Sequence, residues 1–87
     1  MSDLVYEKLK KGDIVHYVRA LYSADYYDLL ELKVVNVYSD YCSTTESKSK
    51  QTFIFNRSTA EEFLYVDKKK GLHDLKELEK KGKKKIE

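Results

Sequence analysis

Few side chains in this sequence could act as nucleophiles, bases or metal ligands, and they lie far apart in the chain. The only histidines are His16 and His73, and the only cysteine is Cys42. A nucleophile needs a base beside it, and a zinc site needs several Cys or His ligands at close spacing. No such spacing occurs here. We therefore expect each histidine at the surface or at a sheet edge, and Cys42 as a half-buried structural residue.

Two pairs of acidic residues are the remaining candidates for acid–base chemistry. They are Glu61 with Glu62, and Asp25 with Asp28. General acid–base catalysis needs carboxyl groups in a pocket of low dielectric constant, where their pKa values move apart. Both pairs lie in polar, loop-like sequence, and the three glycines form no phosphate-binding loop. We therefore expect solvated carboxylates and a protein that is not an enzyme, with no cofactor and no metal.

Tyrosine is unusually frequent, with eight copies in 87 residues. Five tyrosines flank the loops around the expected central strand: Tyr22, Tyr26, Tyr27, Tyr38 and Tyr41. Exposed tyrosines suit protein interfaces, because they bring a large contact area at a low cost in conformational entropy. They could also stack on unpaired bases. The alternative is aromatic packing that closes a small barrel.

Acidic residues accompany three of these tyrosines in the loop expected at residues 22–27. Carboxylates beside aromatic rings disfavour contact with phosphate, so this end of the domain should prefer a protein partner, in particular one with a basic patch. The predicted protein-binding residues are Tyr22, Asp25, Tyr26, Tyr27 and Asp28.

Lysines are concentrated near the end of the chain. Residues 67–87 hold nine lysines and five acidic residues, a net charge of +4, whereas residues 1–66 hold eight basic and ten acidic residues, a net charge of −2. Clustered lysines attract the phosphate backbone of nucleic acids. The alternative nucleic-acid-binding residues are Lys68, Lys69, Lys70, Lys80, Lys81, Lys83, Lys84 and Lys85. Interleaved acidic residues weaken this basic stripe, and a solvated helix face is the simpler interpretation.

Length and composition suit one small folded domain. A chain of 87 residues with 41% hydrophobic residues can fold, but it has little depth for an enclosed catalytic cleft. We expect the domain at residues 1–82 and a frayed basic tail at 83–87. The sequence has no signal-peptide pattern and no apolar run of about 20 residues, and its lone cysteine fits a reducing compartment. A cytoplasmic protein without membrane contact is predicted.

The pattern of apolar residues predicts a β-rich domain. The longest strand-forming run is at residues 28–38, where both faces carry large apolar side chains, as in a central strand covered on one side and partly on the other. Residues 39–40 suit a hairpin turn, and residues 46–50 are expected to form a mobile loop tip. The expected strands are residues 14–21, 28–38, 41–45, 51–56 and 63–66, the last of which could instead continue a helical turn.

Signals for short helices precede the first strand and follow the fourth. Residues 2–9 could form one or two helical turns or an irregular arm. Residues 57–62 carry two capping-box spacings, which predict a single helical turn there. The pairs at that spacing are Ser58 with Glu61 and Thr59 with Glu62.

The last helix is expected at residues 67–81. Asp67 is its predicted N-cap, and Gly82, after two lysines, is its predicted C-terminal cap. Its apolar residues recur every third position and would form one stripe against the sheet. They are Leu72, Leu75 and Leu78.

The order of these elements predicts an α+β fold: a small antiparallel SH3-like sheet or partly open barrel of about five strands, with a C-terminal helix. The run Lys11-Gly12-Asp13-Ile14-Val15 is similar to the opening of many bacterial SH3-like barrels, where a Gly-Asp turn leads into the first strand. Over residues 10–80 the layout resembles the barrel-plus-helix proteins of Gram-positive bacteriophages and mobile elements. The resemblance implies an accessory role, in contact with a host protein, a defence system or nucleic acid.

A second similarity is to the signalling SH3 domains of eukaryotes. It rests on Ala20-Leu21-Tyr22 and the acidic run at residues 28–32. The groove of those domains for proline-rich peptides uses tryptophan and proline, and this chain has neither. Binding of proline-rich peptides is therefore not carried over.

These features predict a non-catalytic accessory protein that binds another protein. An inhibitor of a host or defence protein is one concrete form of this prediction. The alternative is a nucleic-acid-binding module that uses the lysine-rich helix, with weak binding and no sequence preference.

Overall fold

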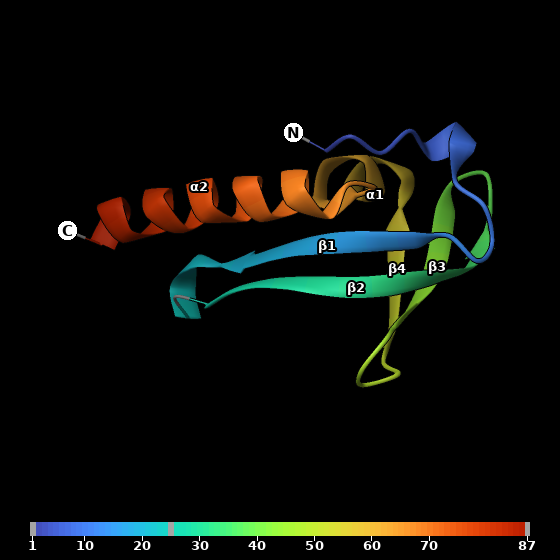
Figure 1. Cartoon of the computed structure of the whole chain (residues 1–87), viewed down its shortest axis with the longest axis horizontal. Helices are drawn as coiled ribbons and strands as arrows, with labels where there is room; N and C mark the ends of the chain where they lie inside the picture. The colour runs from blue at the N-terminus through green and yellow to red at the C-terminus, as the bar shows by residue number, and fades with distance from the viewer. Residues whose placement is uncertain (1, 25, 87) are drawn as a thin grey trace.

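The computed structural model describes residues 2–24 and 26–86, except for the side chains of Tyr22 and of residues 82–86. Figure 1 shows a curved sheet with one long helix beside it. In chain order the elements are η1 (Tyr6–Lys8), β1 (Ile14–Leu21), η2 (Tyr22–Ala24), β2 (Tyr26–Val37), β3 (Tyr41–Glu46), β4 (Thr52–Asn56), α1 (Arg57–Phe63), β5 (Leu64–Tyr65) and α2 (Lys68–Ile86). The predicted α+β class and all five predicted strands are confirmed.

The strands of the described residues form one antiparallel sheet in the order β4-β3-β2-β1-β5. β1 pairs with β2 along its whole length, from Ile14 opposite Lys33 to Leu21 opposite Tyr26. After α1 the chain returns to place β5 along the other side of β1. The sheet stays open between its edge strands β4 and β5. This arrangement confirms the expected partly open antiparallel sheet with a C-terminal helix.

β2 is the central strand, and it curls the sheet. Its register with β3 shifts between Val34 and Asn36, which marks a β-bulge. A bulge bends its strand and increases the local twist. β3 and β4 consequently run across β1 and β2 (Figure 1), and the two halves of the sheet enclose one core. The central strand predicted at residues 28–38 is confirmed, although β2 already begins at Tyr26.

The main core also contains the N-terminal arm, which we define as residues 2–9. The strands and α1 contribute Val15, Leu32, Val34, Cys42, Phe55, Ala60 and Leu64. The arm adds the buried side chains of Leu4, Tyr6 and Leu9. The Tyr6 hydroxyl donates a hydrogen bond of 2.6 Å to the carbonyl oxygen of Tyr38. Of the two alternatives for this segment, an irregular arm with one 3-10 turn is observed, and the arm is part of the core.

A second, smaller core joins α2 to the other face of the sheet. Leu75 packs there with Val18 and Tyr65, and Leu78 lies beside them. The prediction that Leu72 belongs to the same stripe is wrong, because its side chain is 41% exposed. At 3.6 residues per turn, two steps of three residues leave Leu72 and Leu78 about 120° apart around the helix.

Gly71 makes the first close contact between α2 and the sheet. A Cβ atom at this position would lie 3.3 Å from Cδ1 of Leu29 and 3.4 Å from Cβ of Tyr65. These distances are tighter than most contacts of a Cβ atom, so a side chain here would require Leu29 or Tyr65 to shift. The close approach favours glycine, although glycine inside a helix costs about 1 kcal/mol relative to alanine.

The two ends of α2 differ in how well they follow the prediction. Asp67 is the N-cap, as expected, because its carboxylate accepts a hydrogen bond of 2.9 Å from the N–H of Lys69. The predicted stop at Gly82 is wrong, since α2 continues to Ile86. A glycine inside a helix costs only about 1 kcal/mol, and the lysines around it are good helix formers.

Two polar segments are held by hydrogen bonds from side chains to the backbone. The helical turn expected at residues 57–62 is α1. Its N-cap is Asn56, whose side-chain oxygen accepts a hydrogen bond of 2.8 Å from the N–H of Thr59. Residues 46–50 form the expected tip between β3 and β4, and their mobility stays a prediction. Glu46 at the start of this turn is buried, and its carboxylate accepts hydrogen bonds from the backbone N–H groups of Lys48 and Ser49. These hydrogen bonds lower the pKa of Glu46, and the bond from Lys48 has the largest effect. They also hold the turn in place.

Candidate functional site

The residues that could have done nucleophilic or metal chemistry lie apart. His16 is buried in the middle of β1, between Glu31 of β2 and Tyr65 of β5, so its expected place at an edge or surface is wrong. His73 is exposed on α2, as expected. Cys42 is fully buried, and burial raises the pKa of its thiol, which disfavours the nucleophilic thiolate. Among the described residues, no three His, Cys, Asp or Glu side chains are grouped to hold a metal ion.

The predicted pair Glu61 and Glu62 lies on α1, and both residues are exposed. Arg57 makes an ion pair of 3.8 Å with Glu61 and a second ion pair with Glu7 of the arm. Their exposure confirms the predicted surface carboxylates, and the ion pair between Arg57 and Glu7 links α1 to the arm.

The tyrosine-rich end of the β1–β2 hairpin is arranged differently from the expected loop. Tyr26 and Tyr27 belong to β2, and successive strand residues point to opposite faces of the sheet. Tyr27 is half-buried and packs with the second core under α2. Tyr26 is 43% exposed on the other face. Tyr22 lies in η2 with its side chain outside the described part, and Asp25 lies outside the described residues altogether.

Tyr26 and Asp28 form a compact cluster with Arg19 of β1. The Tyr26 hydroxyl donates a hydrogen bond of 2.9 Å to Asp28, and the Arg19 guanidinium lies 5.2 Å from the centre of the Tyr26 ring. Arg19 also approaches Asp28 at 3.6 Å. Of the five predicted protein-binding residues, the structure therefore brings Tyr26 and Asp28 together and places Tyr27 on the opposite face.

The described lysines of α2 are exposed, and three of them share one face of the helix with His73. Lys68, Lys69, Lys70, Lys80 and Lys81 all lie on the surface, whereas the side chains of Lys83, Lys84 and Lys85 are outside the described part. At 100° per residue, one face directed away from the sheet carries Lys69, His73, Lys76 and Lys80. We call this row the basic stripe.

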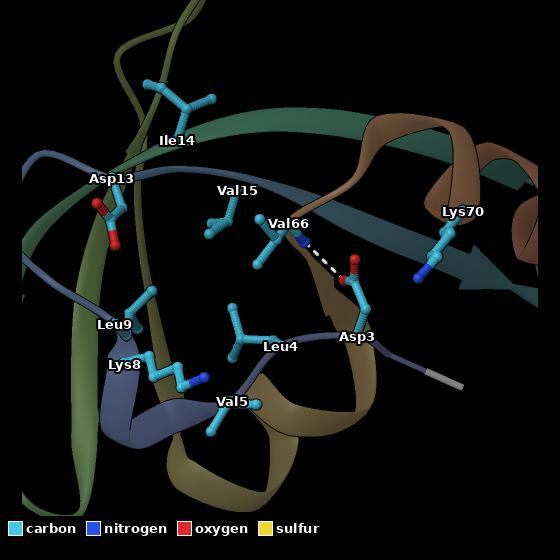
Figure 2. Close-up of a pocket in the computed structure, with 10 residues that line it drawn as sticks. All are labelled: Asp3, Leu4, Val5, Lys8, Leu9, Asp13, Ile14, Val15, Val66 and Lys70. Atoms are coloured by element: carbon cyan, nitrogen blue, oxygen red, sulfur yellow. Dashed lines mark hydrogen bonds between the residues drawn. The ribbon is translucent and has the colours of Figure 1, made fainter.

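A groove that the sequence did not suggest lies between the N-terminal arm, the start of β1 and the junction of β5 with α2 (Figure 2). Its volume is about 520 Å³. Buried side chains of Leu4, Leu9 and Val15 line its floor. Its apolar walls are Val5, Ile14 and Val66, which are 47%, 45% and 58% exposed. Charged side chains complete its rim: Asp3, Lys8, Asp13 and Lys70. We call this feature the arm groove.

The charges around the arm groove are not equally available to a ligand. The Asp3 carboxylate accepts hydrogen bonds of 2.7 Å and 3.1 Å from the N–H groups of Val66 and Asp67, the first of which is drawn in Figure 2. The Asp13 carboxylate accepts a hydrogen bond of 2.9 Å from the N–H of Lys10. Within the described part of the chain, neither Lys8 nor Lys70 makes an ion pair. Backbone N–H groups therefore engage the two carboxylates of the rim, whereas the two lysine ammonium groups have no such partner, although the four charges sum to zero.

Sequence reasoning missed the arm groove because its walls come from three separate segments. Val5, Ile14 and Val66 come from three distant parts of the chain, each at or next to the end of an element, and no periodic pattern connects them. The one available signal was the apolar content of residues 2–9, which is unexpectedly high for a surface arm.

Comparisons with known proteins identify no relative. No protein-family model matches the chain, and no match is found among curated proteins or solved structures. None of the helices in residues 2–24 and 26–86 is both long enough and apolar enough to cross a membrane.

Proposed function

We propose that this protein is a non-catalytic binding protein whose arm groove receives an apolar side chain from an acidic segment of another protein. The observation that carries the proposal is the combination of exposed apolar walls with two lysines at the rim that form no ion pair with any described residue. An apolar side chain would fill the groove, while carboxylates on either side of it would meet Lys8 and Lys70.

The size of the arm groove supports this proposal. Its volume of about 520 Å³ lies within the range of roughly 300–1,000 Å³ that is typical of ligand sites. Three exposed apolar residues, Val5, Ile14 and Val66, also share this one hollow, and grouped apolar side chains are a common feature of interaction sites. The floor is fixed by core residues, so the groove is formed before the partner arrives, which reduces the entropic cost of binding.

The setting of this function follows from the resemblance of the sequence to SH3-like bacteriophage and mobile-element proteins. We propose an accessory protein of that kind, with the inhibition of a host or defence protein as its concrete role. The buried thiol of Cys42 is compatible with a reducing cytoplasm, which we propose as its compartment. The tyrosine end of the hairpin is a weaker candidate for the interface, because Tyr26, Arg19 and Asp28 already bond to one another, although the buried Nε of Arg19 has no partner among the described residues.

A peptide array tests the groove directly, whatever the identity of the partner. We expect the protein to enrich peptides that carry one large apolar residue flanked by Asp or Glu. For an enriched peptide, Lys70→Glu should weaken binding by about tenfold or more, equivalent to 1.4 kcal/mol, in a fluorescence anisotropy titration. The physical reason is that the substitution places a negative charge beside the carboxylates of the peptide.

Lys69→Glu is the matched control for this measurement. It makes the same change of charge one residue away, but Lys69 does not line the arm groove. We expect it to change the affinity by less than about threefold, as is usual for a charge outside the contact. Equal losses in both variants, or enriched peptides that lack acidic residues, would contradict the proposed site.

Binding of nucleic acid is the second candidate, and the basic stripe is the observation that favours it. Lys69, Lys76 and Lys80 follow one another along the exposed face of α2. Glu77, however, pairs with Lys80 at 4.0 Å and reduces the positive charge available to phosphates. For this reason we rank it below the protein partner.

Salt dependence measures what the basic stripe can do. We expect only weak binding of single- and double-stranded oligonucleotides, without sequence preference. Three lysine contacts would lower the affinity by roughly 20- to 40-fold between 50 and 200 mM salt, because each neutralised phosphate releases counterions. Lys76→Glu should remove most of this binding. A complex of submicromolar affinity at physiological salt would reverse the ranking of the two functions.

A further inference from the structure

The outer edge of β4 is an unpaired strand edge without the features that usually protect one. β4 is the last strand on its side of the sheet, and its sequence Thr-Phe-Ile-Phe-Asn contains neither a charge nor a proline. Its pairing with β3 is regular, without a bulge. Natural sheets normally block such edges with lysine, proline, bulges or a covering element. An unprotected edge is therefore a candidate site for pairing with another strand.

The register with β3 shows which backbone groups of β4 point outward. The N–H of Arg57 bonds to the carbonyl of Asp40, and the N–H of Glu46 bonds to that of Gln51. Hydrogen-bonded pairs alternate along an antiparallel ladder, so Phe53 and Phe55 bond to β3. The backbone groups of the alternate residues then point away from β3. They are Thr52, Ile54 and Asn56.

Most of the outward backbone groups of β4 have no hydrogen-bond partner among the described residues. Among the described residues, no hydrogen bond reaches the outward backbone groups of Thr52 or Ile54. The Ile54 side chain is also 68% exposed, the highest value among the exposed large apolar residues of the described chain. Tyr41 and the Tyr38 ring stacked on it at 4.6 Å are also exposed apolar residues at the end of the β2–β3 hairpin.

We propose that the β4 edge pairs with β4 of a second copy of this chain, in antiparallel orientation, with the twofold axis at Ile54. In this register Ile54 faces Ile54 of the second copy, and Thr52 faces Asn56. Apolar thus meets apolar, and polar meets polar, as an isologous interface requires. Ile54 exchanges both backbone hydrogen bonds across the axis, and the N–H of Asn56 donates to the carbonyl of Thr52.

The paired positions themselves carry no charge, so no like charges face each other within the seam. Arg57, the first residue beyond β4, already belongs to α1 and lies outside the ladder. A foreign strand would find the same backbone groups but not this match of side chains, which is why we assign the edge to a second copy. The seam is short, so the dimer is weak and lies at the small end of specific interfaces.

Sedimentation velocity or light scattering of the full chain tests the pairing, from about 10 µM to about 1 mM protein. We expect the mass to rise from monomer to dimer over this range. Ile54→Lys should keep the protein monomeric throughout, because it places two lysines face to face across the axis. Val35→Lys is the matched control: it adds the same charge at a side chain that is 37% exposed on β2, and it should dimerise like the unchanged protein.

A cysteine variant tests the register independently. Directly opposed residues in a hydrogen-bonded antiparallel pair have Cα atoms about 5.5 Å apart, which a disulfide can span. Ile54→Cys should therefore form a covalent dimer under mild oxidation, and Val35→Cys should not. A protein that stays monomeric at about 1 mM, or a dimer that survives Ile54→Lys, overturns the proposal, as does an edge that binds only unrelated peptide strands.

Discussion

Replacing Leu75 with aspartate is expected to unfold the protein, or nearly so. Leu75 is 7% exposed and packs with Val18 and Tyr65 in the core under α2. Burial of a leucine contributes about 1.5–3 kcal/mol, and a buried carboxylate without a partner adds a further penalty. The sum is comparable with the roughly 5 kcal/mol that stabilises a small domain. Thermal unfolding followed by circular dichroism should show a transition at a much lower temperature, or none.

Leu72→Asp is the control that isolates burial from the change of side chain. The same substitution is made one helical turn earlier, at a residue that is 41% exposed. Surface substitutions usually change stability by no more than about 0.5 kcal/mol. We therefore expect the Leu72 variant to melt close to the unchanged protein. If the two variants were equally damaging, or if both were harmless, α2 would not rest on the sheet through the face described above.

Replacing Tyr6 with alanine should be almost as damaging, although Tyr6 lies in an arm that the sequence left undefined. Its side chain is 3% exposed, and the Arg57 guanidinium lies 5.3 Å from its ring centre. Truncation of a buried aromatic residue costs about 3–5 kcal/mol. Burial raises the pKa of the Tyr6 hydroxyl, so the group stays protonated at neutral pH and keeps its bond to Tyr38. Urea unfolding should show the loss as a lower midpoint.

Two further variants separate the packing of Tyr6 from its hydrogen bond. Tyr6→Phe keeps the ring but leaves the carbonyl of Tyr38 without its donor, and we expect a loss of about 1–3 kcal/mol. Tyr41→Ala removes a tyrosine that is 40% exposed, and it should cost far less than Tyr6→Ala. A Tyr6→Ala protein with an unchanged urea midpoint would show that the arm does not belong to the core.

The regular part of the fold could be predicted because its signals are local. β1 begins and ends where the alternating run at residues 14–21 does, and Asp67 caps α2 because an aspartate there can accept a hydrogen bond from the helix start. Errors arose where packing overrides a local pattern. Leu72 repeats at the spacing of Leu75, but Gly71 is the residue that approaches the sheet, and only the tertiary structure reveals that distance.

The candidate site was less predictable than the fold, because it depends on contacts between distant segments. Asp3 reads as an ordinary polar residue, yet it binds the backbone at Val66 and Asp67 and so helps to form the arm groove. Tyr27 was predicted to be an interface residue in a loop, but it lies in β2 and its side chain packs on the α2 side of the sheet. Such pairings cannot be deduced from residue types alone.

The N-terminal arm also constrains the order in which the molecule can fold. Its partners lie very late in the chain: Ser2 donates to the carbonyl of Leu64, 62 residues away, and Asp3 bonds to Asp67, 64 residues away. Contacts of such high sequence separation form slowly, because the entropy of loop closure opposes them. The β2–β3 and β3–β4 hairpins can form while the chain is still being synthesised. The contacts of the arm cannot form until the junction of β5 and α2 has left the ribosome, so neither the main core nor the arm groove can be complete before then.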